Sequence, residues 1–260
     1  MANVVQVIVN ADDLGASKMV NDVTFDLVAQ GKVTSATMIA NAPFLDDALH
    51  RIGGYNSCSF GVHLNLSEFQ PLTDSRAIQD LLDDNGRFSG YDRVRNVDRN
   101  SELTNGVFSE FCAQIDLCKS AGLEISHLDS HHHVHTLPWI FPILKRIQKR
   151  YNVRRLRISK NLYRSTESSS IQLKVKKTAY NFLLRHYFNT ATTGAFSDLL
   201  TFYECATARV LMHKKIEVMV HPGHVAYEGN AEETELLRSP WESRLKFPVE
   251  LISYSDLPAR

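Results

Sequence analysis

Short runs of β-branched and apolar residues alternate with longer segments of helical character from one end of this chain to the other. The expected strands cover residues 4–9, 33–40, 59–66, 125–130, 154–159 and 217–220, with a last apolar segment at 249–252. The expected helices cover residues 17–30, 43–52, 106–121, 138–151, 171–188 and 203–214. Because alternating strands and helices form βαβ units, the sequence predicts an α/β fold with a parallel sheet.

Individual residues mark the ends of these segments. Ser17 is placed to cap the first helix and Gly31 to end it, since each residue type favours that position. Pro138 fits the first turn of a helix, where its missing N–H leaves no bond unmade. The polar stretch at 73–105 is expected to be loop with local helix. No linker or internal repeat divides the chain, so we expect a single domain over residues 1–260.

Composition limits the function classes open to the chain. It holds 29 Lys and Arg against 29 Asp and Glu, so its charge indicates neither nucleic-acid binding nor an acidic membrane surface. No window of uncharged apolar residues is long enough to span a membrane. The four cysteines have no C-x-x-C spacing, and the N-terminus lacks the basic leader of a signal peptide. We therefore expect a cytoplasmic protein, with the basic run at 174–177 a solvated helix face.

Acids and histidines stand where the expected strands end. The first strand runs into Asp12 and Asp13, the third carries His63, and the sixth ends at His221. In a β/α barrel, functional side chains gather at the C-terminal ends of the strands. If the backbone turns there, both carboxylates can reach one pocket, and one could bind metal while the other takes a proton from water. Taken alone, each of these residues also fits a structural role in a cap, a core or a turn.

Five of the eleven histidines fall in the nine residues from 127 to 135. Such a tract is a natural metal-binding composition. Crowded imidazoles also lower one another's pKa, which favours the neutral form that binds metal. By strand alternation His131, His133 and His135 would share a face that His132 opposes. Spacing therefore predicts a metal near this tract and leaves those three histidines as alternatives.

Two histidines and one carboxylate leave open positions on a divalent metal for water and substrate. A neighbouring carboxylate can then deprotonate the water, and a histidine on the opposite side can protonate a leaving amine. Asp129 could orient a histidine ligand through its second ring nitrogen. These are the parts that metal-assisted hydrolysis of an amide or ester requires.

Five segments together resemble the YdjC-like carbohydrate deacetylases, a group that includes the chitooligosaccharide deacetylases. They are Asn-Ala-Asp-Asp-Leu-Gly at 10–15, Val-Thr-Ser-Ala-Thr-Met at 33–38, Gly-Val-His-Leu-Asn-Leu at 61–66, His-Leu-Asp-Ser-His-His-His-Val-His at 127–135 and His-Pro-Gly at 221–223. The segments follow the order of that family and cover nearly the whole chain. The resemblance implies a distorted β/α barrel, TIM-like and of the glycoside hydrolase/deacetylase type.

The resemblance also implies a reaction, the hydrolytic removal of an N-acetyl group from an acetylated amino sugar. It assigns Asp13, His63 and His131 as metal ligands, Asp12 as the general base and His221 as the general acid. The metal of the family is usually magnesium, whereas ligand softness favours zinc for two histidines and one carboxylate, so both ions stay open. The family further suggests a homodimer.

Two residues are candidates for substrate binding. Phe69 lies in the run Ser-Glu-Phe-Gln-Pro-Leu at 67–72, where the family tends to place a glycine before Pro-Leu, and its ring could line a sugar groove. Arg157 could bind a substrate carboxylate, phosphate or hydroxyl, or stabilise an oxyanion, and a salt bridge inside the barrel is its alternative. A milder departure is Leu14, where the family usually has phenylalanine.

Two rival functions differ from deacetylation. A metal-dependent phosphoesterase or another amidohydrolase would also use histidine pairs on barrel strands, but such enzymes usually need more carboxylates to hold two metals. A non-catalytic sugar-binding relative would not need the general base, the ligands and the general acid that this chain retains. Both rivals stay open on sequence alone.

Overall fold

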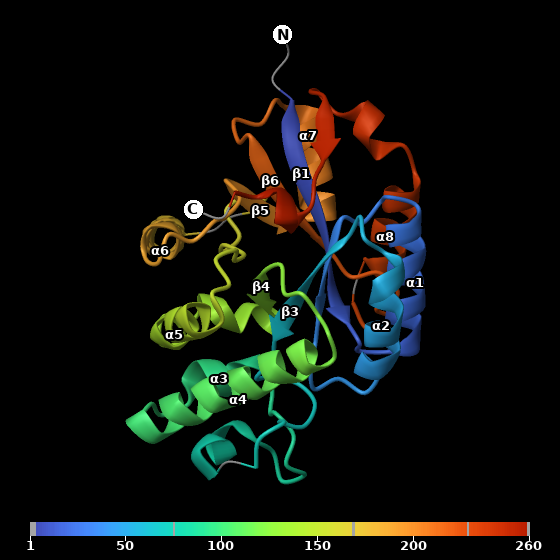
Figure 1. Ribbon diagram of the computed structural model, residues 1–260. Coiled ribbons are helices and arrows are strands. Elements are labelled where there is room, and N and C mark those ends of the chain that lie inside the picture. The colour runs from blue at the N-terminus through green and yellow to red at the C-terminus, as the bar shows by residue number, and fades with distance from the viewer. Residues whose placement is uncertain (1–3, 75, 168–169, 228, 259–260) are drawn as a thin grey trace.

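The computed structural model describes residues 4–74, 76–167, 170–227 and 229–258. Its centre is a seven-stranded parallel sheet in the order β4-β3-β2-β1-β6-β5, with β7 paired to β1 (Figure 1). The strands are β1 (Val5–Leu14), β2 (Ser35–Met38), β3 (Ser59–Leu64), β4 (Leu128–Ser130), β5 (Ala195–Asp198), β6 (Lys215–Val220) and β7 (Val249–Leu251). The predicted α/β fold with parallel strands is confirmed.

The central strand β1 has different neighbours along its length. On one edge β7 pairs with its first residues, from Val5 to Val7, and β2 pairs with its last part, from Asn10 to Leu14. On the other edge β6 pairs with β1 from Gln6 to Ala11. All of β1 except Gln6 is buried, which fits the apolar run from Val7 to Val9 and means that Asn10, Asp12 and Asp13 need polar partners inside the protein.

The expected strand at 154–159 is not a regular strand, because it forms only isolated bridges to its neighbours. Arg157 donates its backbone N–H to the carbonyl of Leu128 in β4 at 3.1 Å, and Asn161 donates to the carbonyl of Phe196 in β5 at 3.2 Å. The segment therefore lies between the two end strands of the sheet and links them. The predicted distorted barrel is a curled parallel sheet joined through irregular backbone.

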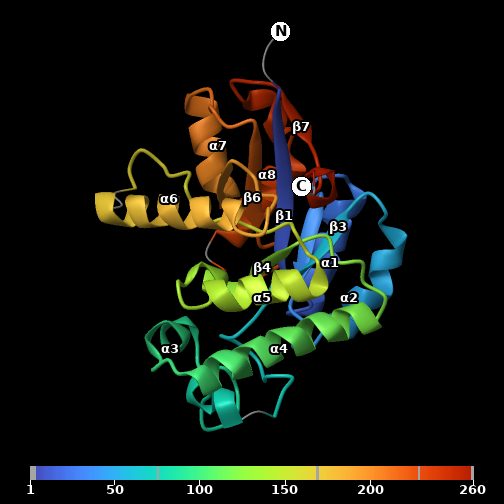
Figure 2. The same cartoon turned by 60° about the vertical axis from the view of Figure 1, so that its left-hand side comes forward.

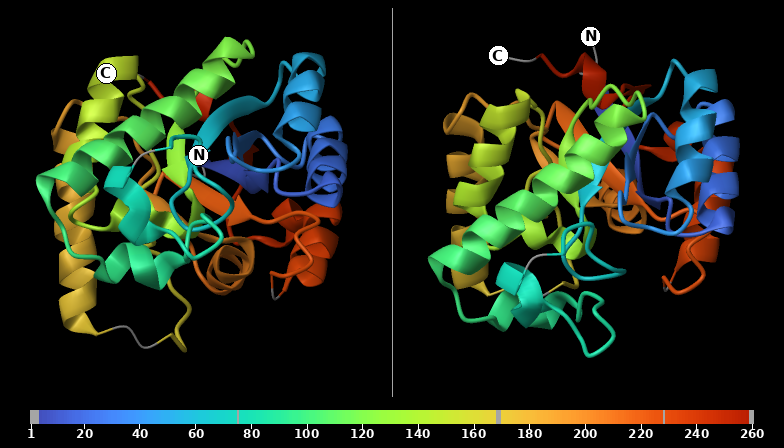
Figure 3. Two further views of the ribbon diagram at one scale, coloured as in Figure 1. Left: turned by 90° about the horizontal axis from the view of Figure 1, so that it is seen from below. Right: turned by 60° about the horizontal axis from the view of Figure 1, so that its bottom comes forward.

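Eight α-helices surround the described strands. They are α1 (Lys18–Ala29), α2 (Leu45–Arg51), α3 (Tyr91–Asn96), α4 (Ser101–Ser120), α5 (Phe141–Tyr151), α6 (Ile171–His186), α7 (Leu199–Ala208) and α8 (Asn230–Arg238). Seen from below, α1 and α2 lie on one side of the strands and α5 and α6 on the other (Figure 3). In Figure 2, α6, α5 and α4 follow one another down one side of the molecule. Within the described ranges, no helix is both long and apolar enough to cross a membrane.

The ends of the helices test the predictions made from single residues. Ser17 caps α1 as predicted, because its hydroxyl accepts a hydrogen bond from the N–H of Val20 at 3.1 Å. The proline in the first turn of α5 is Pro142, so the prediction for Pro138 is wrong. The last predicted helix, at 203–214, instead starts four residues earlier as α7, where the Asp198 carboxylate accepts from a backbone N–H. Strand β5 and helix α8 were not predicted.

Candidate active site

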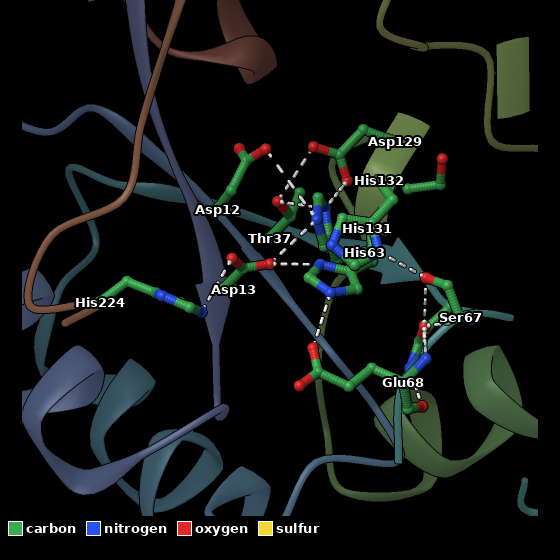
Figure 4. A network of polar contacts seen from close by, with 12 residues as sticks. Asp12, Asp13, Thr37, His63, Ser67, Glu68, Asp129, His131, His132 and His224 are labelled. Carbon is green, nitrogen blue, oxygen red and sulfur yellow. Dashed lines mark hydrogen bonds and ion pairs between the residues drawn. The ribbon is translucent and has the colours of Figure 1, made fainter. Parts of the chain in front are cut away.

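A bulge in β1 places two adjacent acids on the same side. The register between β1 and β2 shifts between Ala11 and Leu14, and Asp13 has a φ of 65°. A non-glycine residue seldom adopts this left-handed conformation, but aspartate tolerates it better than most. Regular alternation would send the Asp12 and Asp13 side chains to opposite faces, whereas the bulge lets both point into one site (Figure 4). The expected backbone turn exists, although the strand continues through both acids.

The three predicted metal ligands converge in the structure. His63 Nε2 lies 3.3 Å from Asp13 Oδ1, and His131 Nδ1 lies 2.8 Å from the same oxygen. One ligand atom from each residue lies within 4.8 Å of the others, and all three side chains are buried. A carboxylate and two imidazoles that meet in this way form a donor set suited to one divalent cation with positions left for water and substrate.

Carboxylates around the two imidazoles favour positive charge in this cluster. Burial would lower the pKa of His63, but Asp129 and Asp12 raise it to about 10. Burial also opposes ionisation of His131, yet Asp13 raises the pKa of that ring to about 9. A divalent cation that binds the same nitrogens must displace these protons, so binding of a metal is coupled to proton release.

Asp129 fixes the orientation of His63. Its Oδ1 lies 2.7 Å from His63 Nδ1, while its Oδ2 accepts a hydrogen bond from the Thr37 hydroxyl at 3.0 Å. The carboxylate oxygen can only accept from Nδ1–H, so loss of the second ring proton would free the Nε2 lone pair for a metal beside Asp13. This geometry supports the predicted role of Asp129 as the partner that orients a metal-binding histidine.

Arg157 holds three buried carboxylates on the other side of the site. Its Nη1 and Nη2 each lie 2.6 Å from an oxygen of Asp12, Nη1 also lies 2.9 Å from Asp129, and Nε lies 2.7 Å from Glu217. The arginine side chain has no exposed surface. Arg157 therefore forms the ion pairs that were its alternative role. Arg157 is not among the described residues that line the cavity, and its contact with substrate stays a prediction from the sequence.

The same guanidinium governs the ionisation of Asp12. Burial would raise the pKa of Asp12, but the charge and hydrogen bonds of Arg157 outweigh burial and hold it well below its ordinary value. Asn10 adds a further hydrogen bond to Asp12 Oδ1 at 2.9 Å. Asp12, His63 and Asp129 also come within metal-binding distance of one another, but Arg157 already neutralises both acids. We therefore read this second group as an ion-pair network.

The histidine tract does not continue the strand. Strand β4 ends at Ser130, and a 3-10 turn follows in which His132 and His133 have φ values of 49° and 56°. The alternation expected for the tract is therefore wrong, since its residues are not extended. His131 enters the metal-ligand cluster, whereas His135 is buried with its Nδ1 2.6 Å from the Ser130 hydroxyl.

His127, the first histidine of the tract, has a structural role. Its Nε2 lies 3.0 Å from Asn10 Oδ1, and its ring stacks on Tyr254 at 3.6 Å between centroids. Because the Asn10 amide nitrogen donates to Asp12, the Asn10 oxygen is left to accept from His127. Gly61 leaves room for this ring, since a Cβ there would lie 2.7 Å from His127 Nδ1. His127 thus holds Asn10, which in turn donates to Asp12.

A cavity of about 530 Å³ opens over the cluster. Its lining comprises Asp12, Asp13, His63, Ser67, Glu68, His131, His132, His133, Met219, His221, His224, Ala226 and Tyr227. Phe69, predicted to line a sugar groove, is not among these described residues, although Ser67 and Glu68 beside it are. Among the described residues, Tyr227 does line this cavity and contributes an aromatic ring to it, while the role of Phe69 stays a prediction.

His221 lies at the end of β6, as predicted, and is held by its surroundings. Its backbone N–H donates to Glu233 Oε2 at 2.6 Å, and its ring stacks on Tyr227 at 4.0 Å between centroids. Burial lowers the pKa of His221, while the nearby Asp13 and Asp12 carboxylates oppose that shift. Gly223 has a φ of 70°, and a Cβ there would lie 2.6 Å from the Met19 carbonyl oxygen, so the turn requires glycine.

Four acids and rings near the site were missed by sequence reasoning. Glu68, His224 and Tyr227 line the cavity, and Glu217 contacts Arg157. One signal was available for Glu217, because an acid inside the apolar run of β6 requires a buried partner. His224 stands one residue after the His-Pro-Gly segment, but its spacing alone does not indicate where its ring points.

Comparison with known proteins gives a consistent family. A carbohydrate deacetylase from Geobacillus stearothermophilus is 36% identical over 146 residues, a match that spans 56% of this chain and 57% of that protein. Carbohydrate deacetylases from Brevibacillus brevis and Vibrio vulnificus are each 29% identical over 97% of this chain, and the matches span 92% and 96% of those proteins.

A solved structure shares the fold. An Enterococcus faecalis protein, described as a candidate cellobiose-phosphate cleavage protein, superposes with a TM-score of 0.73 at 21% identity over 96% of this chain and 98% of that one. The model of the YdjC-like protein family matches residues 6–246, which include the acids of β1, the histidine tract and the His-Pro-Gly turn. The chain therefore belongs to the YdjC-like family.

Proposed function

We propose that this protein is a metal-dependent carbohydrate deacetylase that hydrolyses the N-acetyl group of an acetylated amino sugar or oligosaccharide. The observation that carries the proposal is the cavity in which the Asp13, His63 and His131 cluster lies together with Asp12 and His221. The substrate class comes from the relatives, which are named carbohydrate deacetylases.

Asp13, His63 and His131 would hold the cation. When bound, a divalent ion supplies a Lewis acid for the acetyl carbonyl and lowers the pKa of a water molecule. The carboxylate suits magnesium and the two imidazoles suit zinc, so both ions belong in the test.

The remaining steps use side chains of this chain. Asp12 accepts a proton from the attacking water as the water oxygen bonds to the acetyl carbon. Arg157 holds both oxygens of Asp12, so the carboxylate is ionised and fixed before substrate arrives. Protonated His221 gives its proton to the nitrogen as the C–N bond breaks, leaving acetate and a free amine.

The phosphoesterase alternative has less support from the structure. A site for two metals needs several carboxylates that are free to bind them. Asp12, Asp129 and Glu217 are instead bound by Arg157. Asp13, which is outside this group, faces His63 and His131 and forms no ion pair with a guanidinium among the described residues.

An acetate-release assay tests the proposal. Purified protein is offered a panel of N-acetylated sugars, from monosaccharides to oligosaccharides, with magnesium, zinc, manganese or cobalt. We expect metal-dependent release, which Asp12→Asn should lower by roughly 10²–10⁴-fold while metal stays bound. Asp26→Asn, an exposed acid paired with Arg238, is the matched control and should leave activity unchanged. Protein that binds metal but releases no acetate from the whole panel would contradict the proposal.

A further inference from the structure

The ring of His131 lies between two carboxylates. Its Nδ1 is 2.8 Å from Asp13 Oδ1, and its Nε2 is 2.9 Å from Glu68 Oε2 (Figure 4). The ring is buried, whereas the Glu68 side chain is 44% exposed and reaches the ring from the loop after β3. Carboxylate oxygens accept, so both ring nitrogens donate while the ring is protonated, and a cation that replaces the Nδ1 proton beside Asp13 would leave Nε2–H donating to Glu68.

The other histidine ligand has a similar arrangement in which the two nitrogens are exchanged. His63 turns Nε2 toward Asp13 and donates from Nδ1 to Asp129. His131 turns Nδ1 toward Asp13 and donates from Nε2 to Glu68. A metal-binding histidine commonly gives its second N–H to a carboxylate, which fixes the tautomer and strengthens the ligand. Each imidazole here has such a carboxylate.

Glu68 acts from outside the ligand set. The ligand atoms that come within 4.8 Å of one another belong to Asp13, His63 and His131. The two nitrogens of an imidazole point in different directions, so a cation held at His131 Nδ1 lies on the side of the ring away from Glu68. Glu68 would therefore influence the cation through the histidine.

The backbone of Glu68 is fixed, although its side chain is partly exposed. Asn65 Oδ1 accepts from the Glu68 N–H at 3.1 Å, and Asn65 Nδ2 donates to the Glu68 carbonyl at 2.6 Å. Asn65 is itself buried, and its N–H donates to Gln114 at 2.9 Å. The next-door Ser67 hydroxyl lies 2.9 Å from His132 Nδ1, which ties the loop to the histidine tract. This scaffold aims the carboxylate at His131.

We propose that Glu68 is a positioning residue that holds His131 in the Nε2-protonated tautomer, so that the ring binds the metal through Nδ1 while His63 binds through Nε2. The inference rests on the metal site of the proposed function and names a residue of that site. Loss of the Glu68 carboxylate should weaken metal binding by about 10–100-fold, the usual effect of removing such a partner.

Two measurements test the inference without turnover. In zinc-loaded protein labelled with ¹⁵N at histidine, long-range ¹H–¹⁵N spectra should show His131 protonated at Nε2 and zinc-bound at Nδ1, and His63 the reverse. Zinc titration against a chromophoric chelator should give Glu68→Gln a 10–100-fold higher Kd. Glu68→Asp should recover part of the affinity. Glu204→Gln, a glutamate of similar exposure (47%) paired with Arg164, should match the wild type.

The outcomes separate this inference from the proposed function. Zinc at Nε2 of His131, or an unchanged Kd in folded Glu68→Gln, would overturn the inference even if acetate is released. The expected tautomers without acetate release would support the inference and contradict the deacetylase proposal. Wild-type protein that binds no zinc would overturn both. If Glu68→Gln does not fold, the wild-type spectrum still decides, because it requires no variant.

Discussion

Asp12 and Asp13 are neighbours on one strand, yet they lie in opposite electrostatic environments. Asp12 is bound through both oxygens by Arg157, a cation that belongs to the protein. Asp13 faces the imidazoles of His63 and His131, which can exchange protons for an external cation, and His224 Nε2 lies 3.6 Å from the other oxygen of Asp13. A buried charge needs a partner: Asp12 has a permanent guanidinium, whereas Asp13 has imidazoles whose protons, in the proposed function, a cation from solution would replace. The contrast gives the same residue type two functions.

The two sides also differ in their backbone. Among the described residues, seven non-glycine residues have positive φ, and three of them lie in or beside the metal-ligand cluster: Asp13, His132, whose ring packs on His131, and Phe69, which follows Glu68. Left-handed conformations of such residues are unfavourable and are retained mainly where function requires them. The metal side is therefore assembled from strained turns, whereas the Arg157 side depends on charge pairing.

The largest expected effect is on the Arg157 side. Arg157→Met would leave three buried carboxylates without their counter-charge, and we expect a loss of about 3–5 kcal/mol in the free energy of unfolding, measured by urea denaturation. Arg157→Lys should lose less, because it keeps the charge but not the two-pronged geometry. The control is Arg146→Met on an exposed arginine that contacts Asn105. A loss below about 1 kcal/mol for Arg157→Met would mean that the ion pairs contribute little.

The second prediction compares the effect on metal binding of replacing each acid in turn by asparagine. Asp13→Asn should remove the metal, because it deletes the charged ligand, whereas Asp12→Asn should keep it. We expect the affinity of Asp13→Asn to fall by more than the roughly 10–100-fold typical of an outer carboxylate. Elemental analysis after dialysis against a weak chelator would measure both. Equal metal content in the two variants would contradict the division of roles between these acids.

Glu233 is a third buried acid near the site, and burial rather than a neighbouring cation dominates its pKa. Glu233 is buried beside His221, and burial raises its pKa from 4.5 to about 8. Between these values the folded protein keeps a proton that the unfolded chain has lost, so stability falls as pH rises through this window. Each pKa unit corresponds to about 1.4 kcal/mol, and the buried carboxylate should relax, so we expect a loss on the order of 2 kcal/mol.

Urea midpoints of wild type and Glu233→Gln at pH 5 and pH 8 would measure this effect. The glutamine keeps an oxygen for the His221 N–H but cannot ionise, so the wild-type decline should flatten in the variant. Glu235→Gln on the same helix is the control. A decline of equal size in Glu233→Gln would assign the pH dependence to another group.

The smallest expected effect concerns strain on the metal side. Phe69 has a φ of 63°, a conformation that glycine adopts without cost. Phe69→Gly should relieve about 1 kcal/mol of strain, partly offset by the greater freedom of glycine in the unfolded chain, for a net change within about 0.5 kcal/mol. Phe69→Ala, which keeps the strain and loses the ring, should be clearly less stable than Phe69→Gly in thermal melts. If the two variants melt together, the strain is not significant.

Much of the fold follows from local sequence signals. Buried strands, the cap at Ser17 and the helix at 171–186 come from apolar runs and single residues with strong preferences. The irregular segment that carries Arg157 could not be predicted, because its few hydrogen bonds come from two strands distant in sequence. Strand β5 reads Ala-Phe-Ser-Asp, so it has no β-branched residue and no apolar run longer than two residues to mark it as a strand.

Some residues of the site could likewise be found from sequence motifs, and the roles of others could not. Motifs placed Asp12, Asp13, His63, His131 and His221 in one cavity, and the structure brings them together. The roles of Arg157 and Glu68 depend on distances across the fold that no spacing encodes. Alternation failed for the histidine tract because its backbone leaves the strand at Ser130. The homodimer and the cytoplasmic location stay predictions from the sequence.

The pairing of β1 has a consequence for how the protein is made. Strand β1 is synthesised before β6 and β7, two of its hydrogen-bonded partners, which follow it by about 200 residues or more. Contacts between such distant segments slow folding, because a long loop must close before they form. Asp12 and Asp13 therefore emerge from the ribosome long before the strand that carries His221. A nascent chain halted after residue 200 would hold these acids without the β6 pairing that completes the catalytic cavity.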